Sequence, residues 1–144
     1  MRVVITFFAF CIVLFSCANK VSSPDKYKTA YKFMQYAKDD DIKGVYSLLM
    51  DGDLKNDTER INFHINKMHE FFTKYGIPDK SKWSIEYDTL SPIIKLETLV
   101  IPIFKGYDNE NSLEEATLRL DFDYTKQHLS HDFVVSYDLR VKRR

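Results

Sequence analysis

The hydrophobic period of the chain changes at Pro78, and this change constrains the fold more than any other feature. Before Pro78, apolar residues recur at intervals of three and four, as on one face of a helix. After Pro78, apolar and polar residues alternate, which is typical of antiparallel strands with one buried and one solvated face. The sequence therefore predicts helices first and strands afterwards.

Three helices are predicted before Pro78. The first begins near Asp25, with Ser23 or Asp25 as its cap, and a short one covers about 41–50 before a turn at 51–53. The third begins at Asp57 or Thr58 and ends at Gly76, which stands where a C-cap glycine belongs. The apolar faces of the first and third helices are Tyr27, Ala30, Tyr31, Met34 and Ala37, and Ile61, His64, Ile65, Met68, Phe71, Phe72 and Tyr75.

Four strands are predicted after Pro78. Pro102 indicates that the second is irregular or lies at an edge. Acidic residues fall on the outward faces, among them Glu86, Glu97, Asp121 and Asp138. The predicted inward residues are Trp83, Ile85, Tyr87, Ile94, Leu96, Val100, Phe104, Ala116, Leu118, Leu120, Phe122, Tyr124, Phe133, Val135, Tyr137, Leu139 and Val141.

Helices packed on one face of a four-stranded antiparallel sheet make an α+β domain. The segment 30–49, with Phe33, Ala37, Asp41, Val45 and Leu48-Leu49, resembles the opening of the nuclear transport factor 2-like (SnoaL-like) superfamily. That resemblance implies a curved sheet and a cone-shaped domain with a cavity. A cystatin-like sheet wrapped on a helix is the structural alternative.

The N-terminus has the pattern of a secretory signal. A charged start, Met1-Arg2, precedes an apolar run from Val3 to Phe15 that is interrupted only by Thr6. A membrane-spanning helix needs about 20 apolar residues, so this run is too short for one. We therefore expect a signal peptide at 1–16, a lipidated Cys and tether at 17–24, and one domain at 25–144.

The signal run ends in Leu14-Phe15-Ser16-Cys17, which resembles the lipobox of bacterial lipoproteins. Phe15 departs from the small or branched residue common in that family. The resemblance implies cleavage before Cys17, a thioether-linked diacylglycerol and acylation of the new amino group, so that the membrane is a partner. Ala18, in place of Asp, implies the outer membrane, facing the periplasm. The alternatives are a secreted protein with a chance Cys and a Cys11–Cys17 disulfide, but Cys11 would leave with the signal.

Charge and motifs exclude several classes of function. Loss of Arg2 with the signal leaves 20 Lys and Arg against 21 Asp and Glu, a formal charge of −1, which does not suit nucleic-acid binding. No cofactor or metal site is predicted: Thr73 stands where a His69-Glu70 zinc helix would need its second His. His128 and His131 could hold a metal, but a polar turn explains them equally.

A binding site is predicted only as a grouping of side chains. If the cone holds a pocket, His64, Tyr27, Tyr31, Trp83 and Tyr87 would line it, and the same residues equally describe a filled core. No catalytic residue is assigned, because a lone His without an inward carboxylate makes a poor acid–base site. We therefore expect a non-catalytic binding or interaction domain, with an envelope protein or a small apolar ligand as partner. The alternative is a small envelope hydrolase or isomerase that uses His64 and a pocket tyrosine.

Overall fold

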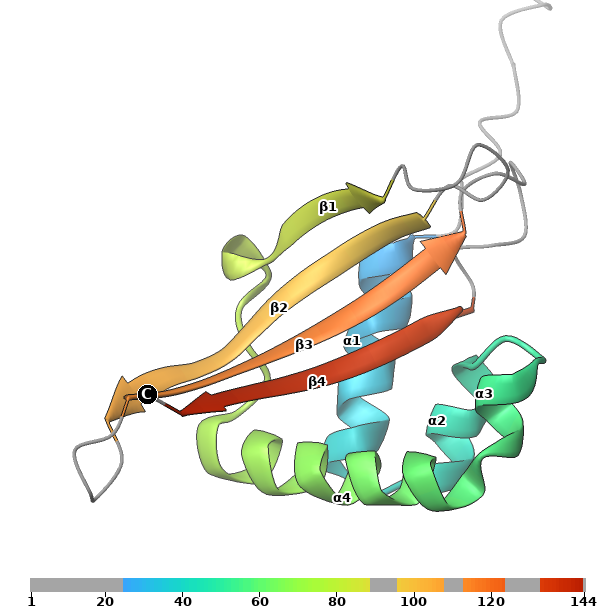
Figure 1. Ribbon diagram of the computed structural model, residues 1–144, viewed down its shortest axis with the longest axis horizontal. Coiled ribbons are helices and arrows are strands. Elements are labelled where there is room, and N and C mark those ends of the chain that lie inside the picture. The colour runs from blue at the N-terminus through green and yellow to red at the C-terminus, as the bar shows by residue number, and fades with distance from the viewer. Residues whose placement is uncertain (1–24, 89–95, 108–112, 124–132, 144) are drawn as a thin grey trace, which may run out of the picture.

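The computed structural model describes residues 25–88, 96–107, 113–123 and 133–143, without the side chains of residues 53, 54 and 88. Helices precede strands, as predicted, and the helices pack on a four-stranded antiparallel sheet to give an α+β domain (Figure 1). The elements are α1 (Lys26–Lys38), α2 (Ile42–Leu48), α3 (Asp53–Asn56), α4 (Thr58–Tyr75), the 3-10 helix η2 (Lys80–Lys82), β1 (Ser84–Asp88), β2 (Leu96–Tyr107), β3 (Leu113–Asp123) and β4 (Ser136–Arg143).

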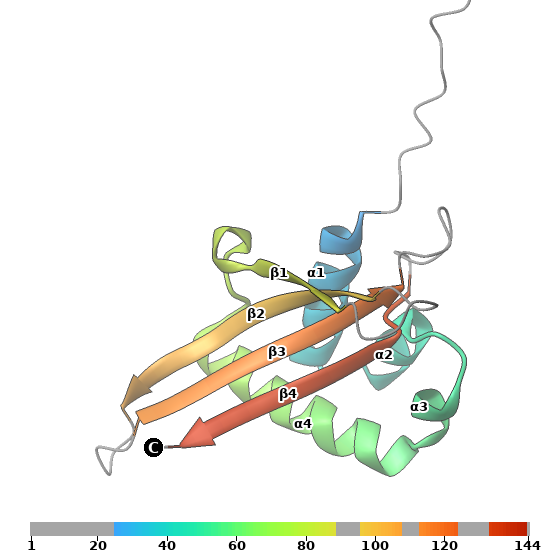
Figure 2. The ribbon, with the colours of Figure 1, turned by 45° about the horizontal axis from the view of Figure 1, so that its top comes forward.

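The strands form a meander in the order β1-β2-β3-β4, so each strand pairs with its neighbours in sequence. Figures 1 and 2 show α1 and α4 on the same side of this sheet. No described helix covers the opposite side, which we call the open face. The register of β2 against β3 shifts between Pro102 and Phe104, which confirms the predicted irregularity at Pro102.

Polar caps fix the ends of the helices. The Asp25 carboxylate accepts a hydrogen bond from the Tyr27 backbone N–H at the start of α1. The Asp57 carboxylate accepts a hydrogen bond from the Arg60 backbone N–H at the start of α4. At the other end, Gly76 ends α4 with a φ of 77°. The predicted turn at 51–53 is in part wrong, because Asp53–Asn56 forms the short helix α3.

The core lies between the helices and the sheet. It contains buried side chains from α1, α4 and the three longer strands, and the largest fully buried ones are Phe33, Phe72 and Phe122. β3 follows the predicted alternation: Ala116, Leu118, Leu120 and Phe122 are buried. Burial of these apolar side chains stabilises the fold by about 25 cal/mol for each Å² of apolar surface removed from water.

The predicted face of β2 is wrong. Leu99, Ile101 and Ile103 point into the core, and Glu97, predicted to face outward, is only 4% exposed on the same side. Both faces of this strand carry apolar residues, so the period of two fits either register. The buried carboxylate is tolerated because Lys26 of α1 forms an ion pair with it.

Four further predicted core positions differ, and one of them is Val141, which is 44% exposed near the end of β4. Tyr31 and Tyr87 are 49% and 61% exposed, and Phe33 takes the place of Tyr31 on the buried face of α1. Phe133 is 41% exposed and Val134 is buried in its place, because residues 133–135 precede β4 and do not follow its alternation. Val134 instead forms an isolated bridge to Leu49.

Candidate functional site

The five residues grouped by sequence as a candidate pocket lie at three places. Tyr27, Tyr31 and Trp83 line a surface hollow beside α1. Tyr87 lines a different pocket, on the open face of the sheet. His64 lies on α4, with its ring 5.6 Å from that of Tyr137 on β4.

The hollow beside α1 has a volume of about 630 Å³, which is within the range of small-molecule sites. Its walls are the first turns of α1 and the segment that joins α4 to β1. We call it the aromatic hollow. Its lining residues are Asp25, Tyr27, Lys28, Tyr31, Lys32, Ile77, Pro78, Asp79, Lys80 and Trp83.

Local sequence explains how the aromatic hollow is built. Tyr27 and Tyr31 are four residues apart, so they lie one above the other on α1. Gly76 ends α4, and the chain then returns to the side of α1 through η2. Trp83 follows η2 and stacks on Tyr27 with 6.2 Å between ring centroids and 27° between planes.

Polar contacts hold the far wall of the aromatic hollow in place. The Trp83 indole N–H donates to the Pro78 carbonyl at 3.2 Å, and the Lys80 ammonium lies 3.9 Å from the Tyr27 ring centroid. Asp79 caps η2, and hydrogen bonds from the Ser81 hydroxyl and backbone N–H lower the pKa of its carboxyl. The sequence pattern missed the lysines, because solvated charges carry no periodic signal of a site.

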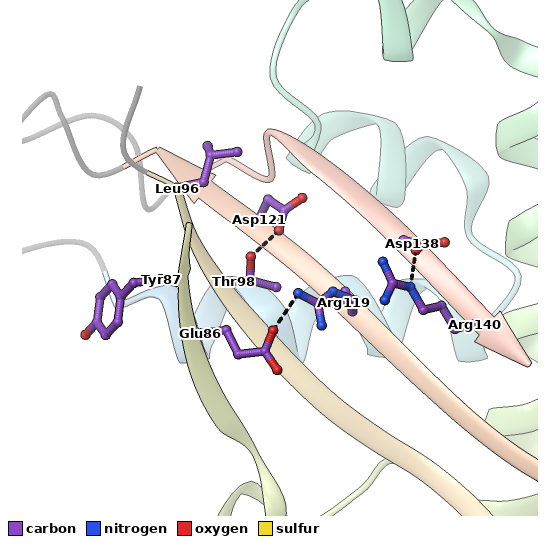
Figure 3. Close-up of a pocket in the computed structure, with 8 residues that line it drawn as sticks. All are labelled: Glu86, Tyr87, Leu96, Thr98, Arg119, Asp121, Asp138 and Arg140. Atoms are coloured by element: carbon purple, nitrogen blue, oxygen red, sulfur yellow. Dashed lines mark hydrogen bonds and ion pairs between the residues drawn. The ribbon is translucent and has the colours of Figure 1, made fainter. Parts of the chain in front are cut away.

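The second pocket, of about 370 Å³, lies on the open face. Figure 3 shows Glu86 and Arg119 pointing toward each other, 2.7 Å apart, while Tyr87 points away at the edge. Arg140 pairs with Asp138 at 2.6 Å, and this contact raises the pKa of Arg140. We call this pocket the sheet-face pocket.

Asp121 on β3 is one of the lining residues of the sheet-face pocket. Its carboxylate accepts a hydrogen bond from the Thr98 hydroxyl at 2.5 Å and another from the Ser136 hydroxyl. The predicted outer-face positions of Asp121 and Asp138 are confirmed, and Arg119 and Arg140 lie on the same face. Arg119 on β3 reaches across β2 to Glu86 on β1.

His64 lies in a polar cluster at the edge of the core. The His64 Nδ1 and the hydroxyls of Tyr46 and Tyr137 are buried without a hydrogen-bond partner among the described residues. Burial, and then the positive charge of Arg60, lowers the pKa of His64. Burial also raises the pKa of Tyr137 to about 12, so both side chains are uncharged at neutral pH.

The inward carboxylate, Glu97, is separate from His64. Glu97 pairs across the sheet with Phe122, whereas Tyr137, the neighbour of His64, pairs with Leu120. Glu97 is instead bound by Lys26 at the start of α1. The arrangement therefore neutralises the carboxylate with an ammonium and does not set it beside the imidazole.

Within the described ranges, no three His, Cys, Asp or Glu side chains gather into a site for a metal ion. His69, the start of the failed zinc motif, has its Nδ1 2.7 Å from the Lys38 carbonyl oxygen. His128 and His131 lie outside the described residues, and so does Cys17. None of the helices in the described part of the chain is long and apolar enough to span a bilayer.

Comparisons with protein-family models, with curated proteins and with solved structures found no match to this chain.

Proposed function

We propose that the chain is a lipid-anchored lipoprotein of the bacterial cell envelope whose domain, residues 25–144, binds or interacts without catalysis. One observation carries the anchor: a short signal-type apolar run leads directly into Leu14-Phe15-Ser16-Cys17. Each buried methylene contributes about 0.8 kcal/mol, and two or more chains are needed for stable attachment. A diacylglycerol on Cys17 with a further acyl chain on its amino group meets that requirement.

A binding role is supported by the chemistry of the described surface and core. Proton-transfer catalysis needs titratable groups that converge on one reacting atom. His64 contacts Tyr137, whereas the Glu97 carboxylate is paired with Lys26. The two surface depressions instead combine aromatic or charged side chains in open positions suited to recognition.

Element order supports a relation to the nuclear transport factor 2-like superfamily. A helix, two short helices and a long helix precede a four-stranded antiparallel meander, with α1 and α4 on one face. We propose this relation as the origin of the fold, with the function still argued from the sites.

The anchor is tested by Cys17→Ser expressed beside the unaltered chain in bacteria fed radiolabelled palmitate. The unaltered chain should carry label and sediment with membranes, in the outer-membrane fraction of a density gradient because Ala18 follows the Cys. The variant should lose both the label and the membrane association. Equal labelling of the two chains would contradict the proposal.

A second candidate, a small envelope hydrolase or isomerase, has one observation in its favour. The His64 Nδ1 and the Tyr137 hydroxyl are buried without a hydrogen-bond partner among the described residues, and their rings are 5.6 Å apart. Turnover of an ester or ketone substrate that His64→Gln abolishes, and that His69→Gln leaves intact, would favour this candidate over the binding role.

A further inference from the structure

We propose that the aromatic hollow is the surface that the anchored domain lays on its own bilayer, with its lysines contacting anionic phospholipid headgroups. The proposal rests on acylation of Cys17, and it adds an orientation: one face of the domain, and not the others, meets the membrane. Three observations support it, namely the place of the hollow in the chain, its aromatic residues and its local charge.

The hollow lies at the tethered end of the domain. α1 begins at Lys26, nine positions after Cys17, and nine residues span at most about 30 Å. Five lining residues come from the cap and first two turns of α1. In Figure 2 the start of α1 and the residues that precede β1 lie at the same end of the molecule. A lipid on Cys17 therefore keeps this end of the domain close to the headgroups.

The aromatic residues have the properties of side chains found at membrane interfaces. Tyr and Trp concentrate at the headgroup level, because an apolar ring and a polar tip suit both environments. Tyr31 is 49% exposed, and Tyr27 and Trp83 are half-buried in the wall of the hollow. Ile77 and Pro78 add apolar surface between them. The hollow thus offers an amphipathic surface rather than a purely charged one.

The local charge is opposite in sign to that of the mature chain as a whole. Lys28, Lys32 and Lys80 are exposed at the hollow. The two carboxylates there, Asp25 and Asp79, accept hydrogen bonds from the backbone N–H groups at the starts of α1 and η2. These carboxylates therefore partly neutralise the positive ends of the two helices. The ammonium groups of the hollow are left to face an anionic surface.

Trp83 provides the measurement, because it is the only tryptophan of the chain and it lies in the hollow. The full acylated protein is reconstituted into vesicles of phosphatidylglycerol and phosphatidylcholine, with or without bromine on the acyl chains close to the headgroups. Bromine quenches tryptophan only at short range. We expect brominated vesicles to remove at least about half of the Trp83 emission, as for a residue at the interface.

Charge reversal at the hollow should abolish this quenching without detaching the protein. Lys28→Glu with Lys80→Glu is compared with Lys43→Glu with Lys142→Glu, which reverses two exposed lysines elsewhere. Tyr31→Ser is compared in the same way with Phe63→Ser, because Phe63 is exposed on α4, away from the hollow. The hollow variants should lose most of the quenching and still float with the vesicles, whereas the control variants should keep it.

The outcomes separate this proposal from the anchor on which it rests. A protein that is acylated and floats, but whose Trp83 emission is the same with and without bromine, contradicts the orientation and leaves the anchor standing. The hollow would then be open to a soluble ligand. Equal quenching in the hollow and control variants also contradicts the orientation. A chain that carries no acyl group contradicts both proposals.

Discussion

At the residue scale, the ion pair between Lys26 and Glu97 joins the start of α1 to a buried position on β2. The two side chains are 15% and 6% exposed, so both charges are largely removed from water. Such a pair adds little net stability over an apolar pair, but removal of one member leaves a buried charge without its counter-ion. The prediction for β2 was wrong at Glu97, because a carboxylate in an apolar strand is normally assigned to the solvent-facing side.

Replacement of Lys26 by Met should therefore lower the free energy of unfolding by about 3 kcal/mol. The double variant Lys26→Met with Glu97→Met should recover most of that loss, because it buries no charge. Urea denaturation of the four chains of this cycle measures both effects. Lys67→Met, which breaks the exposed pair with Glu70 on α4, is the control and should cost less than about 1 kcal/mol. A Lys26 effect no larger than the Lys67 effect would contradict the buried-pair account.

The lowered pKa of His64 predicts how the free energy of unfolding depends on pH. Its pKa is lowered in the folded state by burial and by Arg60, from the ordinary value of 6.5. Between the folded pKa and 6.5 the unfolded chain binds more protons than the folded chain, so stability rises with pH in that window. Stability should fall as the pH drops below about 6.5.

His64→Gln should flatten this slope, as measured by thermal unfolding at a series of pH values between neutrality and mild acid. The His69→Gln chain keeps His64 and should keep the slope. If the two variants lose stability equally as the pH falls, some other group controls the acid response.

At the element scale, the end of α4 decides where the chain turns back toward α1. Gly76 has a φ of 77° and a ψ of 173°, a backbone conformation almost confined to glycine. Its position directs residues 77–83 to the side of α1, where they build one wall of the aromatic hollow.

Gly76→Ala should cost about 1–3 kcal/mol through backbone strain. It should also perturb Trp83 fluorescence, because the wall that carries Trp83 must shift. Gly52→Ala is the matched control: its new Cβ meets nothing within 4 Å, and no positive φ is recorded there. A Gly76 variant as stable as the Gly52 variant would show that the turn adapts without strain.

The same scale shows how far the sequence predicted the fold. The period of α4 and the alternation of β3 were read correctly, because each element has one apolar face and one polar face. The buried face of β2 was predicted wrongly, because both faces of this strand carry apolar residues. Leu96, Val100 and Phe104 lie on one face, and Leu99, Ile101 and Ile103 lie on the other, buried face. α3 was missed because four residues are too few to show a period.

The candidate site was less predictable than the fold. Tyr27, Tyr31 and Trp83 come together only because the segment after Gly76 returns to α1, which is a tertiary contact without a local signal. Tyr87 was expected to face inward from its alternation, yet it lies at the edge of the sheet-face pocket. Periodicity assigns a residue to a face, and the packing of elements decides which residues of that face meet.

At the scale of the whole molecule, the domain has different surfaces on its different sides. Helices cover one face of the sheet, and the open face carries paired charges around Asp121. The aromatic hollow lies beside the first turns of α1. The open face lies on the side of the sheet opposite α1, whose first turns line the hollow.

The proposed lipid on Cys17 can be detected by mass spectrometry of the protein isolated from bacterial membranes. We expect an N-terminal peptide that begins at Cys17, with residues 1–16 removed and the mass of a diacylglycerol and a further acyl chain added. A peptide that still carries residues 1–16, or an unmodified Cys17 at the N-terminus, would contradict it.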